Sequence, residues 1–167
     1  LIYSYLLMFG IAHQATAQTA SAQFAIKNAG VRVEGSFKHV STTIVYDKIN
    51  PSNSRFSGEI KTTSISTGIV MRDNHLRKSD FFDASKYPTI KFVSTSVTAS
   101  SANVLKVTGN LTIKDVTQNV TIIVKVSEQG GKTTFSGTAT LNRMTYNVGG
   151  SSWIMSDEVT LEIKAVQ

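Results

Sequence analysis

A cluster of charged residues between positions 72 and 83 has the clearest capacity for chemistry. Three cations and one imidazole fall within seven residues, at Arg72, His75, Arg77 and Lys78. Guanidinium groups hold phosphate through paired hydrogen bonds and an ammonium acts as a point charge, so these residues could bind a phosphate or diphosphate. The alternative is a solvated surface on which the cations pair with neighbouring carboxylates, at Asp73, Asp80 and Asp83. Pairing is the simpler interpretation, and Arg72 is the leading candidate for an anion contact.

Covalent catalysis and metal binding find little support in the rest of the chain. Its 167 residues include no Cys, which excludes a thiol nucleophile and a Cys-ligated metal. Neither G-x-S-x-G nor H-E-x-x-H occurs, and His39 and His75 have no neighbour in the sequence that would activate a Ser or complete a zinc site. We therefore expect a protein that is not an enzyme and that holds no metal or cofactor.

The composition is typical of one folded domain. Hydrophobic residues make up 41% of the chain and charged residues 17%, which excludes a disordered, charge-rich protein. The formal net charge of +6 favours anionic partners, such as phosphates or a membrane surface, without choosing among them.

The first twelve residues form an uncharged, apolar run that is typical of a secretory segment. Small residues suited to cleavage follow at Ala15 and Ala17, and again at Ala20 and Ala22. We expect residues 1–17 to be a signal peptide that is truncated at its start. Residues 18–167 would then be the mature domain, in the periplasm or secreted. The alternatives are a cut after residue 22, or a first strand or helix of the fold.

From Phe24 onward, apolar and polar residues alternate with a period of two, which places alternate side chains on opposite faces of a strand. Strands are predicted at residues 24–26, 31–39, 42–47, 55–64, 89–98, 105–113, 120–127, 135–141 and 159–165. Residues 71–83 lack this alternation and predict a short helix over 71–78 followed by a turn. Gly130 and Gly131 predict a tight hairpin, because glycine reaches the positive φ values that such turns need.

These strands predict an all-β fold, an eight-stranded antiparallel barrel with a short helix across it. A barrel of this size is filled by its own side chains or holds one slender apolar ligand. Small inward residues, such as Gly58, Gly109 and Gly137, indicate either unfilled space or bends in the strands, and both interpretations stay open. The candidate cavity residues are large apolar members of the inward rows: Phe56, Ile60, Phe92, Leu105, Val107, Leu111, Ile122, Val124, Phe135 and Leu141.

Two other arrangements use the same strands. One is a secreted structural or interaction module with a filled core, in which each apolar residue only packs. The other is an outer-membrane barrel, which would need outward apolar rows and aromatic girdles. It fits less well, because aromatic residues make up only 8% of the chain.

Three blocks of sequence follow a more specific pattern. The first combines residues 24–30 with 33–37; the second contains R-D-N-H-L at 72–76, F-F-D at 81–83 and Y-P at 87–88; and the third covers 107–117. Residues 147–152 and 157–159 extend the pattern to the end of the chain. In this combination the chain resembles the YceI family of secreted, lipocalin-like, polyisoprenoid-binding proteins, and the ordered second block is the most specific part of the resemblance.

The resemblance implies a closed or nearly closed barrel whose elongated apolar interior takes a long isoprenoid or a similar amphiphile without covalent chemistry. The ligand would be an isoprenoid lipid, either a prenyl phosphate or an isoprenoid quinone. Transient contact with a membrane surface and a homodimer are compatible with this interpretation, and no nucleic acid is expected as a partner. Asn28, Ala29 and Gly30 stand where many members carry a His, so a head-group contact from that His is not expected.

Five residues are candidates for the cavity mouth or for contact with the ligand's head group: Arg72, His75, Phe81, Phe82 and Trp153. Phe81 and Phe82 would either form a lid or seal the helix onto the barrel wall. Trp153 would either stack at the entrance or anchor its own loop.

Overall fold

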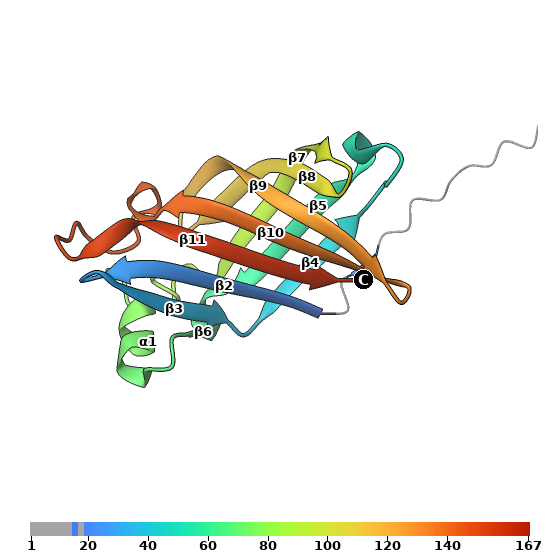
Figure 1. The fold of residues 1–167 in the computed structure, drawn as a ribbon. Coiled ribbons are helices and arrows are strands. Elements are labelled where there is room, and N and C mark those ends of the chain that lie inside the picture. The colour runs from blue at the N-terminus through green and yellow to red at the C-terminus, as the bar shows by residue number, and fades with distance from the viewer. Residues whose placement is uncertain (1–14, 17–18) are drawn as a thin grey trace, which may run out of the picture.

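A single antiparallel sheet curls into a half-barrel (Figure 1). The computed structural model describes residues 15–16 and 19–167. The strands in chain order are β1 Ala15–Thr16, β2 Thr19–Asn28, β3 Val31–Phe37, β4 Val40–Val45, β5 Arg55–Lys61, β6 Ile65–Ser66, β7 Thr89–Ser101, β8 Val104–Ile113, β9 Val116–Gln129, β10 Lys132–Asn142 and β11 Met155–Val166. The helices are α1 Val70–Leu76 and the short 3-10 helices η1 Pro51–Asn53, η2 Thr62–Ser64 and η3 Arg143–Tyr146.

The all-β prediction is confirmed, but the strand count is higher than eight. The spatial order is β1-β4-β5-β7-β8-β9-β10-β11-β2-β3-β6. Nine strands have six or more residues, and they overlap the nine predicted segments. The two additional strands, β1 and β6, are only two residues long, and each pairs along the edge of a longer strand. Such short edge pairings leave no alternating pattern that a sequence could reveal.

The outermost long strands of the sheet are β3 and β4, which are consecutive in the chain but do not pair with each other along a ladder. β3 pairs with β2 and β6, whereas β4 pairs with β5 and β1. Near this seam the Lys38 amide donates to the Ser64 carbonyl at 3.0 Å, and the Lys61 amide donates to the His39 carbonyl at 3.0 Å. The 3-10 helix η2 therefore bridges part of the seam that ladder pairing leaves open.

The expected export segment, residues 1–17, lies outside the described residues except for Ala15–Thr16, which form β1. The alternative cut after residue 22 falls within β2, where Ala22 is completely buried. In the part of the chain that the structure describes, no helix is long and apolar enough to cross a bilayer.

Tight turns connect the long strands. Gly130 and Gly131 have φ values of 57° and 75° and join β9 to β10, as predicted. Ala29 and Gly30, with φ values of 50° and 78°, form the corresponding turn between β2 and β3. Sequence patterns did not predict this turn, because Ala rarely adopts positive φ.

The predicted helix over 71–78 is present as α1, Val70–Leu76. It lies at one end of the barrel, beside β3 and β6 (Figure 1). The preceding Gly68 has a φ of 79°, which turns the chain from β6 into the helix. The chain then makes several turns before β7.

The large apolar side chains of the inward rows form two packed clusters. The one nearer α1 includes Phe37, Ile60, Leu111 and Ile113, and the one at the other end includes Phe56, Val97, Leu105, Val126 and Phe135. The apolar rows therefore point into the barrel, opposite to the orientation that the outer-membrane alternative requires.

The inward glycines have different roles. A Cβ on Gly109 would lie 2.4 Å from the Val93 carbonyl oxygen and 2.7 Å from the Phe92 ring, next to a bulge between Ser94 and Ser96. Gly109 therefore marks a bend with close backbone approach. Gly58, by contrast, lines a cavity, and a Cβ there would meet its nearest neighbour at an ordinary 3.6 Å.

Candidate functional site

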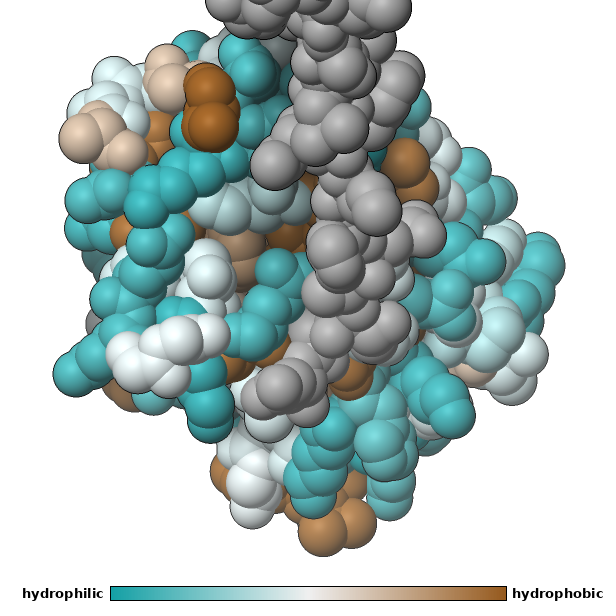
Figure 2. Space-filling model, turned by 90° about the vertical axis from the view of Figure 1, so that its right-hand side faces the viewer, coloured by the Kyte–Doolittle hydropathy of each residue, from teal (hydrophilic) through white to brown (hydrophobic). Residues whose placement is uncertain are grey.

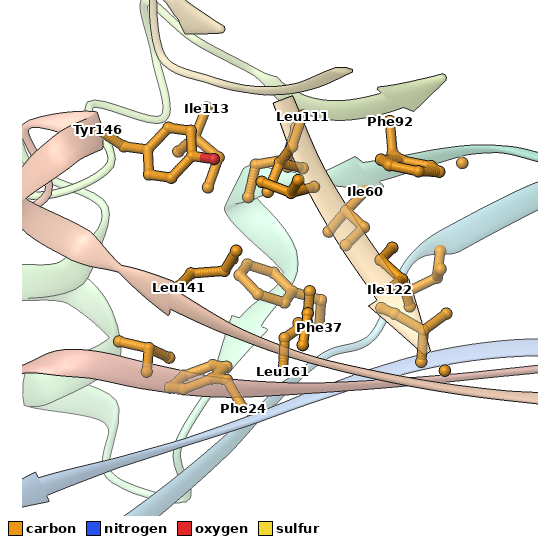
Figure 3. A pocket seen from close by; sticks show the side chains of 18 of the residues that line it. Phe24, Phe37, Ile60, Phe92, Leu111, Ile113, Ile122, Leu141, Tyr146 and Leu161 are labelled. Atoms are coloured by element: carbon orange, nitrogen blue, oxygen red, sulfur yellow. The ribbon is translucent and has the colours of Figure 1, made fainter. Parts of the chain in front are cut away.

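An apolar cavity of about 260 Å³ occupies the barrel interior (Figure 3). Every long strand contributes to its wall, and so do α1 and η3. Figure 3 shows residues from distant parts of the chain, among them Phe24, Ile60, Leu111, Leu141 and Leu161, around one common space. The volume lies just below the range of about 300–1,000 Å³ that is common for ligand pockets, so a slender ligand fits this shape better than a bulky one.

Nine of the ten predicted cavity residues line this space: Phe56, Ile60, Phe92, Val107, Leu111, Ile122, Val124, Phe135 and Leu141. Leu105 does not. It is 3% exposed and belongs to the cluster at the end away from α1, together with Val97 and Val126, neither of which lines the cavity. We call these three residues the plug. The cavity therefore runs from the α1 end toward the plug.

The prediction missed several wall residues. Those from the strands include Phe24, Val33, Phe37, Val40, Thr42, Ile44, Ile113, Val120, Val159, Leu161 and Ile163. Most of them lie in the same alternating rows as the predicted residues, so periodicity could have indicated them. Tyr146 is different, because it lies in η3, where no period-two pattern exists.

Two hydroxyl groups in this wall are buried without a hydrogen-bond partner among the described residues, Thr42 Oγ1 and Tyr146 Oη. Tyr146 is only 2% exposed, and its oxygen points into the space shown in Figure 3. Burial raises the pKa of the Tyr146 hydroxyl above its ordinary value, because the charged form would lose its solvation. The group therefore stays protonated at physiological pH and can donate a hydrogen bond.

Arg143 is a buried cation at the edge of the cavity, and sequence reasoning missed it. Its Nη1 donates to the carbonyls of Val148 and Gly150 at 3.0 and 2.9 Å. Its Nη2 donates to Asp157 Oδ1 at 3.0 Å, and Nε donates to the Ser156 carbonyl at 2.9 Å. These bonds tie the loop between η3 and β11 to the barrel, so the principal role of Arg143 is to shape that loop.

Arg72 is the predicted head-group residue that reaches the cavity. Its Nε donates to Thr67 Oγ1 at 2.8 Å and its Nη2 donates to the Thr67 carbonyl at 2.9 Å. No protein partner within the described chain is found for Nη1. The guanidinium is therefore held in place by one residue and keeps donor capacity at the wall.

The buried side chain of Asp73 also contacts Thr67, in the loop before α1. Its Oδ1 accepts hydrogen bonds from the Thr67 amide at 2.8 Å and the Thr67 hydroxyl at 2.5 Å. Burial by itself would raise the pKa of Asp73. The two Thr67 hydrogen bonds and the charges of Arg77 and Arg72 outweigh this effect and leave the pKa below its ordinary value.

Of the other candidates for the cavity mouth, Phe81 and Phe82 line the cavity and His75 does not. His75 is exposed and does not line the cavity, and its Nε2 lies 2.8 Å from Asp80 Oδ2. Phe81 packs edge-on against His75 with the ring centroids 5.0 Å apart, and Phe82 packs edge-on against Phe37 with the centroids 5.9 Å apart. Both phenylalanines also line the cavity. Among the residues that the structure describes, no three His, Asp or Glu side chains converge on a common point.

Trp153 is fully exposed and does not line the cavity. It belongs to a set of exposed apolar residues at the α1 end, which we call the apolar rim: Val31, Ile69, Val70, Met71, Trp153 and Ile154. The segments that carry them are linked, because the Ala29 amide donates to the Ile154 carbonyl at 2.7 Å and the Gly149 amide donates to the Asp80 carbonyl at 2.9 Å. The opposite end of the molecule is mostly hydrophilic where its surface can be seen (Figure 2).

Comparisons with known proteins place this geometry in a family. Residues 13–167 match the model of the YceI-like domain. A UPF0312 protein of Pseudomonas syringae pv. tomato is 33% identical over 155 residues, which cover 87% of this chain and 81% of that protein. The crystal structure of Burkholderia cenocepacia BcnA is 31% identical with a TM-score of 0.85, covering 89% of this chain and 96% of that one.

A more distant structure has the same fold. It is described as a polyisoprenoid-binding domain from Saccharophagus degradans, and it is 14% identical with a TM-score of 0.71, covering 92% of this chain and 98% of that one. The family match covers both the strands that build the cavity and the α1 segment at its mouth. The chain belongs to the YceI family.

Proposed function

We propose that this protein binds a long isoprenoid, or a similar amphiphile, inside its barrel and carries it without covalent chemistry. The observation that carries the proposal is the cavity, about 260 Å³ in volume and walled almost entirely by apolar side chains from all the long strands. A hydrocarbon chain needs mainly desolvated area, and burial contributes roughly 25 cal/mol per Å² of apolar surface. The Saccharophagus degradans domain supports the proposal, because its fold is the same and its description names polyisoprenoid binding.

The cavity wall offers two positions at which the polar head group of a ligand could bind. At the wall near α1, Arg72 can donate from Nη1 to an anion such as a phosphate, because its Nε and Nη2 already donate to Thr67. In η3, Tyr146 is more fully buried than Arg72 and offers a neutral donor. A prenyl phosphate would use the first position and an isoprenoid quinone the second.

The apolar rim suggests how a ligand would enter and leave. Met71 is 84% exposed and Trp153 is fully exposed, and such side chains enter the headgroup region of a bilayer readily. The net charge of +6 adds attraction to anionic lipid. We propose transient docking of the α1 end on a membrane surface, by a protein that works in the periplasm or outside the cell.

Native mass spectrometry of protein purified from its own host tests the proposal. The expected result is a stoichiometric lipid adduct, and solvent-extracted, delipidated protein should take up a prenyl phosphate or an isoprenoid quinone at one molecule per chain. If the purified protein carries no lipid and takes up neither a prenyl phosphate nor a quinone, the proposal is wrong. The result would then favour a module that acts through its surface.

A further inference from the structure

Among the residues that the structure describes, the Tyr146 hydroxyl has no hydrogen-bond partner, and most of the cavity wall around it is apolar. It is 2% exposed, and its neighbours in the packed cluster are aliphatic and aromatic side chains such as Ile113, Leu111 and Val148. A buried hydroxyl without a partner costs free energy, and such groups in folded proteins are rarely left unexplained. Phenylalanine would fill the same position without that cost.

Packing alone does not explain why this position carries a tyrosine, because the side chain points its hydroxyl into the cavity. Tyr146 is held by η3, whose turn is fixed by Asn142 accepting a hydrogen bond from the Met144 amide at 2.8 Å and by the Val148 amide donating to the Arg143 carbonyl at 3.1 Å. The ring is therefore presented by a fixed turn, and its oxygen is aimed at the space where a ligand would lie (Figure 3). In a mostly apolar pocket, a few placed polar groups decide which ligand is accepted.

We propose that Tyr146 is a specificity-determining residue that donates a hydrogen bond to a neutral oxygen of the bound molecule. The inference rests on the proposed function and narrows it to an apolar chain that carries a neutral acceptor, such as a ring carbonyl, an ester or an amide. An anionic group at this depth would lose its solvation beside aliphatic side chains without a counter-charge from Tyr146. A phosphate is therefore disfavoured at this position. Of the two cations in the cavity wall, Arg143 already donates to Asp157 and to three backbone carbonyls, whereas Arg72 keeps Nη1 available.

The test compares the unmodified chain with Tyr146→Phe against three probes. These are a decyl-substituted benzoquinone, decylbenzene, which has the same chain and ring without carbonyls, and farnesyl phosphate. Affinities are measured by competition with a fluorescent apolar probe. We expect Tyr146→Phe to weaken the quinone roughly three- to tenfold and to leave decylbenzene and farnesyl phosphate unchanged within twofold.

Two further measurements separate hydrogen bonding from packing. The carbonyl stretching band of the bound quinone should lie at lower frequency in the unmodified protein than in Tyr146→Phe. The ligand-free variant should also melt a few degrees higher, because it no longer buries an unpartnered hydroxyl. Tyr46→Phe is the matched control, since Tyr46 packs on Phe135 at 5.3 Å and does not line the cavity, and it should change none of these values.

Other outcomes would overturn the inference. Equal losses for all three probes would show that Tyr146→Phe alters the shape of the cavity and not a specific bond. An unchanged quinone affinity and carbonyl band would show that the hydroxyl does not reach the ligand, while the proposed lipid binding would survive. Failure of the unmodified protein to bind any of the three probes would remove the proposed function and this inference together.

Discussion

At the end of the barrel away from α1, Val97, Leu105 and Val126 are between 1% and 7% exposed, whereas at the α1 end Phe24, Leu141 and Leu161 are only half-buried around a cavity. Both ends consist of the same kind of alternating strand. The difference shows that an apolar row does not by itself decide between a solid core and a binding site. That outcome depends on which side chains meet across the sheet.

Pairs of aromatic rings line the cavity at both ends. Near the plug, the ring of Phe135 packs edge-on against both Tyr46 and Phe56, with ring centroids 5.3 Å and 5.6 Å apart, and Phe56 and Phe135 also line the cavity. At the α1 end, Phe37 contacts Phe24 at 5.7 Å and Phe82 at 5.9 Å, and all three rings remain in the cavity wall. At both ends, therefore, aromatic rings pack against one another and also form part of the cavity wall, and the plug itself consists of the aliphatic residues Val97, Leu105 and Val126.

The largest expected effect is on stability. Leu105→Ala should lower the free energy of unfolding by about 2–5 kcal/mol, because it opens a void in a packed cluster. Leu141→Ala should cost about 1 kcal/mol, because its side chain already borders open space and loses fewer contacts. Urea denaturation of both variants measures the difference. Equal losses would mean that the α1 end is packed as tightly as the plug, which would contradict the comparison.

The next largest effect is on binding. Gly58→Leu places a side chain in the cavity without a clash at its Cβ. At about 0.8 kcal/mol per buried methylene, displacing two or three groups of the ligand should weaken lipid affinity at least tenfold, with little loss of stability. Lipid titration by native mass spectrometry provides the measurement, and Thr138→Leu, on the exposed face of β10, is the control. If both variants bind as the unmodified protein does, the ligand does not occupy this cavity.

A smaller effect is expected at the surface. Met71→Asp should reduce partitioning onto vesicles that contain anionic phospholipid about fivefold, because one rim side chain no longer enters the bilayer. Ile49→Asp adds the same charge at another strongly exposed position, next to η1 and outside the rim, and should have a weaker effect. Vesicle sedimentation distinguishes the two. Equal reductions would indicate attraction by net charge alone and would remove the rim from the proposal.

The smallest effect concerns pH. The pKa of Asp73 lies below its ordinary 3.8 in the folded protein, so its ionised form stabilises the α1 segment above about pH 4. That stability should disappear as the pH falls through the lowered value. The plug residues Val97, Leu105 and Val126 are apolar, so the protection of their own amides should not depend on Asp73.

Hydrogen exchange of the α1 amides measures this change. Their protection should fall as the pH is lowered below 3.8 in the unmodified protein. In Asp73→Asn the protection should be lower at neutral pH and should vary less over the acid range. A parallel acid response in both proteins would assign the effect to other groups.

The period-two pattern was enough to identify the strands, the inward rows and nine of the ten predicted cavity residues, because the alternation of side chains is a local property of an extended backbone. The family resemblance was also contained in the sequence, since the second block carries ordered residues such as Arg72 and Phe81 through the α1 segment. Leu105 shows where this reasoning ended: it shares a row with Val107 and Leu111, yet it lies in the plug.

Only the tertiary structure decided where the barrel is open. The curl of the sheet and the pairing of β11 with β2 determine which rows face one another, and these pairings join residues far apart in the chain. The same applies to Tyr146 and Arg143, because η3 has no periodicity that would predict an inward hydroxyl or a buried guanidinium. A local pattern specifies the face on which a side chain lies, whereas the contacts made across that face depend on the closure of the whole sheet.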